Sequence, residues 1–252
     1  MRLYPIKTDI VRPSDDIVNV ILESLDKAGR ELEDDDVLVL TSKIVAVTQG
    51  RTARLEDFKP SQTAKKLARD FSLDPRFAEI VLTEADEIYG GVEKALLTLK
   101  NGILTANAGI DRKNAPLGSL VLWPRDLKLW ADNIRKRISR ETDKHVAILI
   151  VDSGLSPLRL GTNGLALAVA GFKPVTDLRG GKDLFEKALV ITQHALADDL
   201  ASAAHSLMGE AAEKTPIVLI KDAPIILDDK AYGSSDMTML SGQCIFMSSF
   251  HH

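Results

Sequence analysis

Three aspartates are the residues of this chain best suited to do chemistry. Asp111 follows a small-residue turn, Asp152 follows an unbroken apolar run, and Asp183 lies in a Gly-Gly loop. Carboxylate oxygens are hard ligands that suit Mg²⁺ or Mn²⁺, and these ions suit substrates that carry phosphate groups. Aspartates at strand ends also occur for structural reasons, so spacing alone leaves both interpretations open. The chain contains no Walker P-loop, no GxGxxG after a strand and no HExxH.

The segment that must position Asp152 is the run from Val146 to Val151. Its six consecutive apolar residues are rich in β-branched side chains, and the run is too short for a helix. It predicts a strand buried on both faces, with Asp152 and Ser153 at its carboxyl end. Ligands tend to bind just outside the carboxyl ends of such strands. We therefore expect this strand to hold the Asp152 carboxylate in a fixed position.

The segment 37–51, VLVLTSKIVAVTQGR, is expected to be a strand with a polar break at Thr41-Ser42-Lys43 and a second apolar segment after it. The break has two interpretations: a bulge in the strand or a group that faces phosphate. Both stay open at this stage.

Several further elements follow from periodicity and turn residues. Residues 14–29 predict a helix with Ser14 as its N-cap, and two more helices are predicted from Ser61 and from Asp74. Asn101-Gly102 is a strong hairpin signal. A strand over 118–123 and a helix after Asp126 lead into the Val146 strand.

A long alanine-rich helix is predicted before the final strand at Pro216. His194, Asp198 and His205 fall within one narrow arc of it. The two histidines would be roughly 16 Å apart along the axis, so they cannot share one ion. His194 and Asp198 could bind one together, but the favoured interpretation is an exposed polar helix face.

Composition narrows the class of protein. The chain has 252 residues and a formal net charge of −4, which argues against a nucleic-acid binder that works by bulk electrostatics. One cysteine, the absence of a twenty-residue apolar span and a start without a signal-peptide pattern lead us to expect a cytoplasmic protein with no membrane partner. His251-His252 look like the remnant of a purification tag.

Short motifs in order resemble the CofE-like family, the coenzyme F420-0:L-glutamate γ-ligases. They are NAGID at 107–111, VDSG at 151–154, then RGGKDLF, ADDLASAAHSLMGE and PIVLI. The similarity runs from about Thr8 to about Lys221. It implies an α+β fold of mixed sheets with packed helices, one unit of two intimate lobes whose boundary is unresolved. It also implies a homodimer with its site in a cleft near the subunit interface.

The resemblance implies that GTP and Mg²⁺ or Mn²⁺, with K⁺ assistance, attach L-glutamate to a deazaflavin acceptor through an acyl phosphate. It would make Asp111, Asp152 and Ser153 metal ligands. The residues that would contact the nucleotide are Thr8, Asp9, Ile10, Val11, Thr41, Ser42, Asn114, Met208, Gly209, Glu210 and Thr215.

This chain departs from the family pattern at charged positions. Val47 replaces a lysine of the family's SKAEGR segment, Leu155-Ser156-Pro157 replaces a GR pattern, with only Arg159 nearby, and Glu186 replaces a glycine of DLFGREL. Each lost charge-assisted bond to phosphate is worth roughly 1.5–3 kcal/mol. Three hypotheses follow: a ligase for a deazaflavin acceptor, a ligase for a folate-type acceptor, or a repurposed homologue that binds a nucleotide or a partner without ligation.

Overall fold

A six-stranded mixed sheet forms the body of the protein in the computed structural model, which describes residues 1–112, 115 and 118–249. In spatial order its strands are β1 (Arg2–Ile6), β12 (Ile217–Lys221), β2 (Val37–Thr41), β8 (Ala147–Gly154), β9 (Asn163–Phe172) and β13 (Leu227–Tyr232). β2 and β8 are parallel, whereas the other neighbouring pairs of this sheet are antiparallel. The carboxyl ends of β2 and β8 therefore meet at one edge of the sheet.

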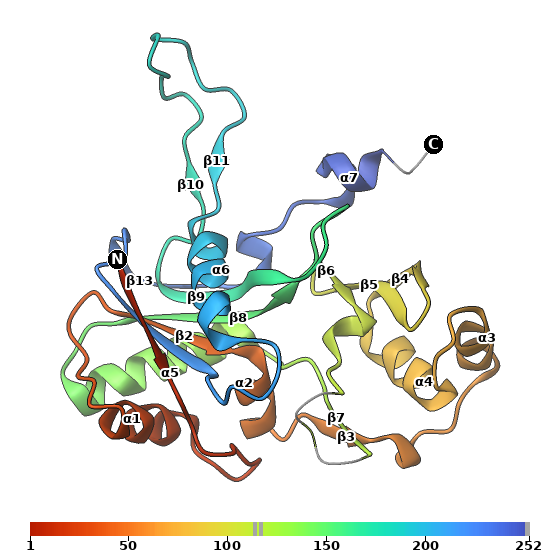
Figure 1. The fold of residues 1–252 in the computed structure, drawn as a ribbon. Helices are drawn as coiled ribbons and strands as arrows, with labels where there is room; N and C mark the ends of the chain where they lie inside the picture. Colours follow the sequence, from red (N-terminus) through yellow and green to blue (C-terminus); the bar gives the residue numbers. More distant parts are fainter. Residues whose placement is uncertain (113–114, 116–117, 250–252) are drawn as a thin grey trace.

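Helices cover both faces of this sheet (Figure 1). α1 (Ile17–Lys27) and α5 (Leu127–Thr142) pack on one face, and α6 (Leu196–Met208) packs on the other. The central strand β8 alternates between the two cores: Ile148 belongs to the first and Leu149 to the second, and both are fully buried. The prediction of a strand buried on both faces is confirmed.

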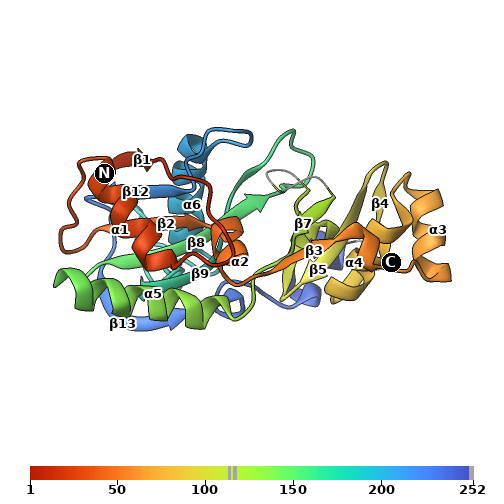
Figure 2. The ribbon, with the colours of Figure 1, turned by 90° about the horizontal axis from the view of Figure 1, so that it is seen from below.

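A smaller region lies beside the sheet (Figure 2). It is entered and left through the antiparallel pair β3 (Thr52–Arg54) and β7 (Ser119–Val121). Between them lie η1 (Leu55–Asp57), α3 (Gln62–Asp70), α4 (Pro75–Glu84), β4 (Glu87–Val92), β5 (Ala95–Lys100), β6 (Ile103–Ala106) and η2 (Asn107–Gly109). This region has its own apolar cluster around Phe77. The hairpin at Asn101-Gly102 and the α+β class are confirmed.

A long hairpin arm projects from the body between β9 and α6 (Figure 1). It is held by the short pair β10 (Thr176–Asp177) and β11 (Gln193–His194). The chain after β13 forms η3 (Ser234–Asp236), η4 (Ser241–Gln243) and α7 (Ile245–Ser248). Among the described residues, no helix has both the length and the apolar character needed to cross a membrane.

Two expectations about local structure were wrong. The apolar segment after Thr41 is the helix α2 (Ser42–Thr48), so the polar break is a strand-to-helix junction and not a bulge. Its β-branched residues favour a strand locally, but Ile44 and Val45 gain more by packing into the core of the sheet as a helix. The N-cap of α1 is Asp16, not Ser14: the Asp16 carboxylate accepts from Val18 N and Asn19 N, each at 3.0 Å.

Candidate functional site

A cavity of about 390 Å³ opens where the carboxyl ends of β2 and β8 meet. It collects nearly all of the site residues predicted from sequence. Those that line it are Thr8, Asp9, Ile10, Val11, Thr41, Asp111, Asp152, Ser153, Met208, Gly209, Glu210 and Thr215. Ser42 lies directly beside this set, and Asn114 lies outside the described residues. The fold thus brings together residues as far apart in the chain as Thr8 and Thr215.

The parallel strands explain how Ser42 and Asp152 meet. Thr41, the last residue of β2, lies opposite Val151 on β8, so the next residue of each strand continues toward the same edge. Ser42 Oγ, which is almost completely buried, donates to Asp152 Oδ2 at 2.6 Å. The N–H of Ser153 donates to Asp152 Oδ1 at 2.8 Å. These bonds fix the orientation of the Asp152 carboxylate.

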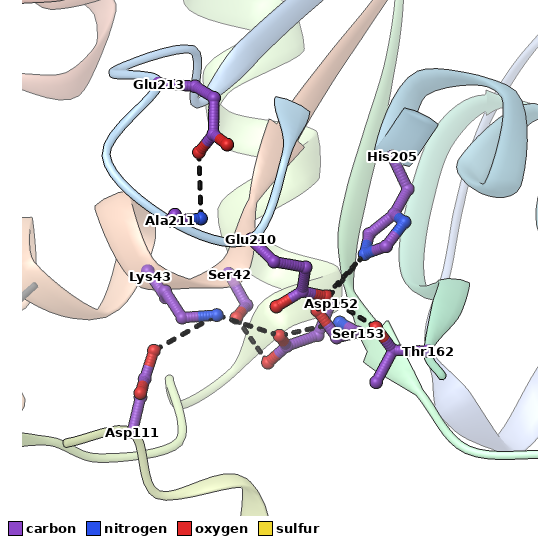
Figure 3. A network of polar contacts seen from close by, with 10 residues as sticks. All are labelled: Ser42, Lys43, Asp111, Asp152, Ser153, Thr162, His205, Glu210, Ala211 and Glu213. Atoms are coloured by element: carbon purple, nitrogen blue, oxygen red, sulfur yellow. Dashed lines mark hydrogen bonds and ion pairs between the residues drawn. The ribbon is translucent and has the colours of Figure 1, made fainter. Parts of the chain in front are cut away.

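Lys43 lies between the two predicted metal ligands (Figure 3). Its Nζ is 3.3 Å from Asp111 Oδ2 and 3.3 Å from Asp152 Oδ1. Burial disfavours the charged ammonium, but the negative charges of Asp152 and Asp111 and their hydrogen bonds outweigh this and raise the pKa of Lys43. The two carboxylates therefore converge on a point that already holds a positive charge.

Asp111 reaches this point from the smaller region. Its backbone is held by an isolated bridge to Val121, with both N–H···O distances at 2.9 Å. Asp152 belongs to the large sheet and Lys43 to α2. The cluster of Lys43, Asp111 and Asp152 thus joins the two regions of the molecule at the cavity wall.

Glu210 organises a second polar group on the same wall (Figure 3). Its Oε1 accepts from Ser153 Oγ at 2.7 Å and from Thr162 Oγ1 at 2.7 Å, and lies 2.8 Å from His205 Nε2. Burial raises the pKa of Glu210, but these hydrogen bonds, led by that of Thr162, lower it to about 2. Glu210 therefore stays ionised beside Ser153.

The segment after α6 folds back to form one side of the cavity. Gly209 has φ 75° and ψ −180°, a backbone conformation that is essentially limited to glycine. Glu213 Oε2 accepts from the N–H of Ala211 at 2.8 Å. The N–H of Thr8 donates to the carbonyl of Lys214 at 3.0 Å, which attaches the N-terminal segment to the loop.

Comparison with known proteins shows the family to which this chain belongs. The model of the F420-0:gamma-glutamyl ligase family matches residues 5–222. The chain belongs to this family. Coenzyme F420:L-glutamate ligase of Methanopyrus kandleri is 36% identical over 223 residues, covering 88% of this chain and 86% of that protein. The proteins of the same name from Methanothermobacter thermautotrophicus and Archaeoglobus fulgidus are 36% and 33% identical over 216 and 222 residues, covering 85% and 88% of this chain and 86% and 87% of their own lengths.

The donors at the cavity of this γ-glutamyl ligase homologue fit a divalent metal ion. The point on which Asp111 and Asp152 converge already holds a cation, the Lys43 ammonium, at 3.3 Å from each carboxylate. No group of three or more His, Cys, Asp or Glu residues that could hold a metal occurs in the described part of the chain. Mg²⁺ commonly takes one or two carboxylates and completes its shell with water and substrate phosphates. Asp111 and Asp152 supply such a pair, and the hydroxyl of Ser153 adjoins it.

Other sequence-predicted candidates lie elsewhere. His194 is in β11 and its Nε2 contacts Asp199 Oδ2 at 2.7 Å, so the prediction that His194 lies in the helix was wrong, and with it the basis for pairing His194 with Asp198. Asp198 instead accepts from Ala166 N at 2.9 Å. Asp183 forms a turn in the arm, where its Oδ1 accepts from two backbone N–H groups, and does not line the cavity.

Sequence reasoning missed three residues of the site. It left Lys43 inside an unexplained polar break, gave Thr162 no role and placed His205 on an exposed helix face. The sequence did contain a signal for Lys43. A charged side chain is unusual in an apolar segment, and Lys43 follows the apolar run that ends at Leu40. His205 and Thr162 offered no pattern, since their contact with Glu210 depends on how α6 packs on the sheet.

A larger cavity of about 790 Å³ lies between α5 and the segment after β13. It contains none of the residues predicted for the site. Two of its carboxylates, Asp132 and Asp229, pair with Lys136 and Arg135. Size alone therefore does not select the candidate site; the smaller cavity is the candidate because two carboxylates converge on one point of its wall.

Proposed function

We propose that this protein is a nucleotide- and metal-dependent ligase that forms a γ-glutamyl amide bond between L-glutamate and a small carboxylated acceptor of the coenzyme F420-0 type. The observation that carries the proposal is the convergence of Asp111 and Asp152 on one point of the cavity wall. Membership of the F420-0:gamma-glutamyl ligase family supports it, as do relatives named coenzyme F420:L-glutamate ligases.

The proposed reaction has two steps. The acceptor carboxylate attacks the γ-phosphorus of GTP and GDP leaves, which gives an acyl phosphate. The amine of glutamate then attacks the acyl carbon, loses a proton and expels inorganic phosphate. A divalent ion, Mg²⁺ or Mn²⁺, held by Asp111, Asp152 and Ser153, with K⁺ assisting, would neutralise phosphate charge.

The chain's own residues position the reactants in this proposal. Thr41 and Ser42 at the end of β2, the segment Thr8 to Val11 and the loop from Met208 to Thr215 surround the space for the nucleotide. The Glu210 carboxylate holds the Ser153 hydroxyl in place at 2.7 Å.

The hairpin arm supports a homodimer as part of the proposal. Leu184, Phe185, Val190 and Ile191 on the arm are between 77% and 97% exposed. Exposed apolar clusters of this kind usually mark an interface. We expect a second copy to cover the arm. Light scattering on the intact protein checks this, and a monomer at micromolar concentration would contradict it.

The activity is tested directly with the purified protein. It is mixed with GTP, Mn²⁺, L-glutamate and coenzyme F420-0, and the products are followed by mass spectrometry. We expect a product heavier by one glutamyl residue, together with GDP and phosphate. Parallel reactions with ATP and with folate-type acceptors establish specificity. Nucleotide binding without turnover on any acceptor would favour a repurposed, non-catalytic homologue instead.

A further inference from the structure

Lys43 lies where the proposed metal ion must lie. Its ammonium is 3.3 Å from each of Asp111 and Asp152, and its side chain is 32% exposed, toward the cavity that it lines. An ammonium and a divalent ion cannot both occupy the space between two carboxylates, because unlike bulk water this partly buried site screens their repulsion poorly. Metal binding therefore requires Lys43 to leave.

The cavity offers Lys43 a place to go only when an anion is present. Among the described residues, five carboxylates line it, from Asp9, Asp111, Asp152, Glu210 and Glu213, against two lysines, Lys43 and Lys214. A triphosphate entering alone would meet an excess of negative charge. A metal ion entering alone would displace an ammonium that has no phosphate to bind.

The local structure allows the movement. Lys43 is the second residue of α2, and its four-carbon side chain has many rotamers. Val47, four residues later and therefore on the same helix face, also lines the cavity and carries no charge that would compete for phosphate. The side chain of Lys43 can thus reach along the cavity wall without meeting another cation from its own helix.

We propose that Lys43 is an exchangeable counter-cation. It neutralises Asp111 and Asp152 in the metal-free protein, and it moves to the nucleotide phosphates when the divalent ion takes its place. Metal and nucleotide consequently bind together, and each alone binds weakly. This inference rests on the proposed function, because it assumes that the cavity takes a metal ion and a nucleoside triphosphate.

The test compares wild type with Lys43→Met, which keeps an unbranched side chain of similar length and good helix propensity. Calorimetry measures the affinity for Mn²⁺ alone, for GTP alone and for GTP with saturating Mn²⁺; thermal unfolding measures metal-free stability. We expect Lys43→Met to bind Mn²⁺ alone at least about tenfold more tightly, because a competing charge is gone. We also expect a lower melting temperature without metal and a weaker effect of Mn²⁺ on GTP affinity.

Lys221→Met is the matched control. Lys221 also lies between two carboxylates, Glu33 at 2.9 Å and Asp36 at 3.2 Å, but it does not line the cavity. We expect it to lower stability and to leave Mn²⁺ and GTP affinities unchanged. Lys43→Gln, which keeps hydrogen-bond donors without the charge, replaces Lys43→Met if the latter does not fold.

The outcomes separate the two proposals. If wild type binds Mn²⁺ and GTP together but Lys43→Met binds Mn²⁺ alone no more tightly, the exchange is overturned and the proposed function stands. Weaker Mn²⁺ binding by Lys43→Met would also overturn the exchange, because it would show that Lys43 helps to hold the metal ligands in place. If wild type binds neither Mn²⁺ nor GTP, the proposed function falls, and the exchange falls with it.

Discussion

Two lysines of this protein have nearly the same surroundings and different consequences. Lys43 lies between Asp111 and Asp152, and Lys221 lies between Glu33 and Asp36. The two clusters lie near opposite ends of β2: Asp36 directly precedes the strand, whereas Lys43 follows it. Burial lowers the pKa of both lysines, but the charges and hydrogen bonds of the neighbouring carboxylates outweigh it, so the pKa of each lysine is raised.

The two clusters differ in their access to the cavity. The carboxylates beside Lys43 line a cavity and come from the smaller region and from β8, whereas Lys221 fastens the segment before β2 to the end of β12. A buried ion pair without a cavity can only affect stability. A similar cluster beside a cavity can exchange its cation for a ligand. Ion pairs alone therefore do not mark the candidate site, and neither does a cavity alone; the candidate site is where two carboxylates converge on one point and also line a cavity.

Asp152→Asn gives the largest effect that we expect. The substitution removes one charge of the metal pair and keeps a side-chain oxygen for the Ser42 hydroxyl. Mn²⁺-dependent GTP binding should weaken by at least about 100-fold, because even the partners of metal ligands are worth 10–100-fold. Calorimetry measures it, and circular dichroism checks the fold. Asp36→Asn in the other cluster is the control and should bind as wild type does. An unchanged GTP affinity in Asp152→Asn would remove Asp152 from the site.

Lys221→Met should act on stability alone. It leaves Asp36, which is 2% exposed, without its ammonium partner. Breaking a buried pair by removing one partner costs about 3 kcal/mol. Urea unfolding measures the loss, with the GTP affinity of the variant as its control. A change in GTP affinity without a change in stability would reverse the roles assigned to the two clusters.

Val47→Lys sharpens the comparison from the cavity side. It adds a cation one helical turn after Lys43, at the position where the resemblance to the family implies a lysine. We expect GTP with Mn²⁺ to bind about tenfold more tightly, since one charge-assisted bond to phosphate is worth roughly 1.5 kcal/mol. Val47→Met, which has similar bulk without charge, should bind as wild type does. No gain over Val47→Met would show that phosphate does not approach this helix face.

A smaller effect is expected at high pH. The pKa of Lys221 is raised above its ordinary value of 10.5 because hydrogen bonds from its ammonium to Glu33 and Asp36 outweigh the burial that lowers it. A raised pKa stabilises the fold fully below pH 10.5, and this stabilisation is lost as pH rises through the folded-state pKa. The stability gap between wild type and Lys221→Met should narrow by at most about 1.4 kcal/mol per pH unit above that value. Unfolding from pH 8 to pH 11.5 measures it, and a widening gap would contradict the assignment.

The sequence predicted the parts of the fold that depend on local pattern. The run of apolar residues before Asp152 identified the central strand, and Asn101-Gly102 identified the hairpin. It failed at Ser42–Thr48, where β-branched residues form a helix because the core of the sheet accepts Ile44 and Val45 in that form. Local propensity cannot report a preference that long-range packing creates.

The candidate site also has features that local sequence pattern predicts and features that only long-range packing creates. Asp111 and Asp152 were found because each follows a recognisable break in the chain, and family resemblance supplied the residues that line the cavity with them. The ion pairs of Lys43 and the contact of Glu210 with Thr162 could not be found this way. Each joins elements that meet only after folding, so no spacing along the chain encodes it.

The most direct test of this account is the location of manganese in crystals grown with Mn²⁺ and GTP, measured by anomalous diffraction. We predict one manganese peak between Asp111 and Asp152, with the Lys43 ammonium withdrawn from both carboxylates and directed to phosphate. No peak is expected beside Lys221. Manganese bound away from the two aspartates while GTP fills the cavity, or Lys43 still bridging them, would contradict the account.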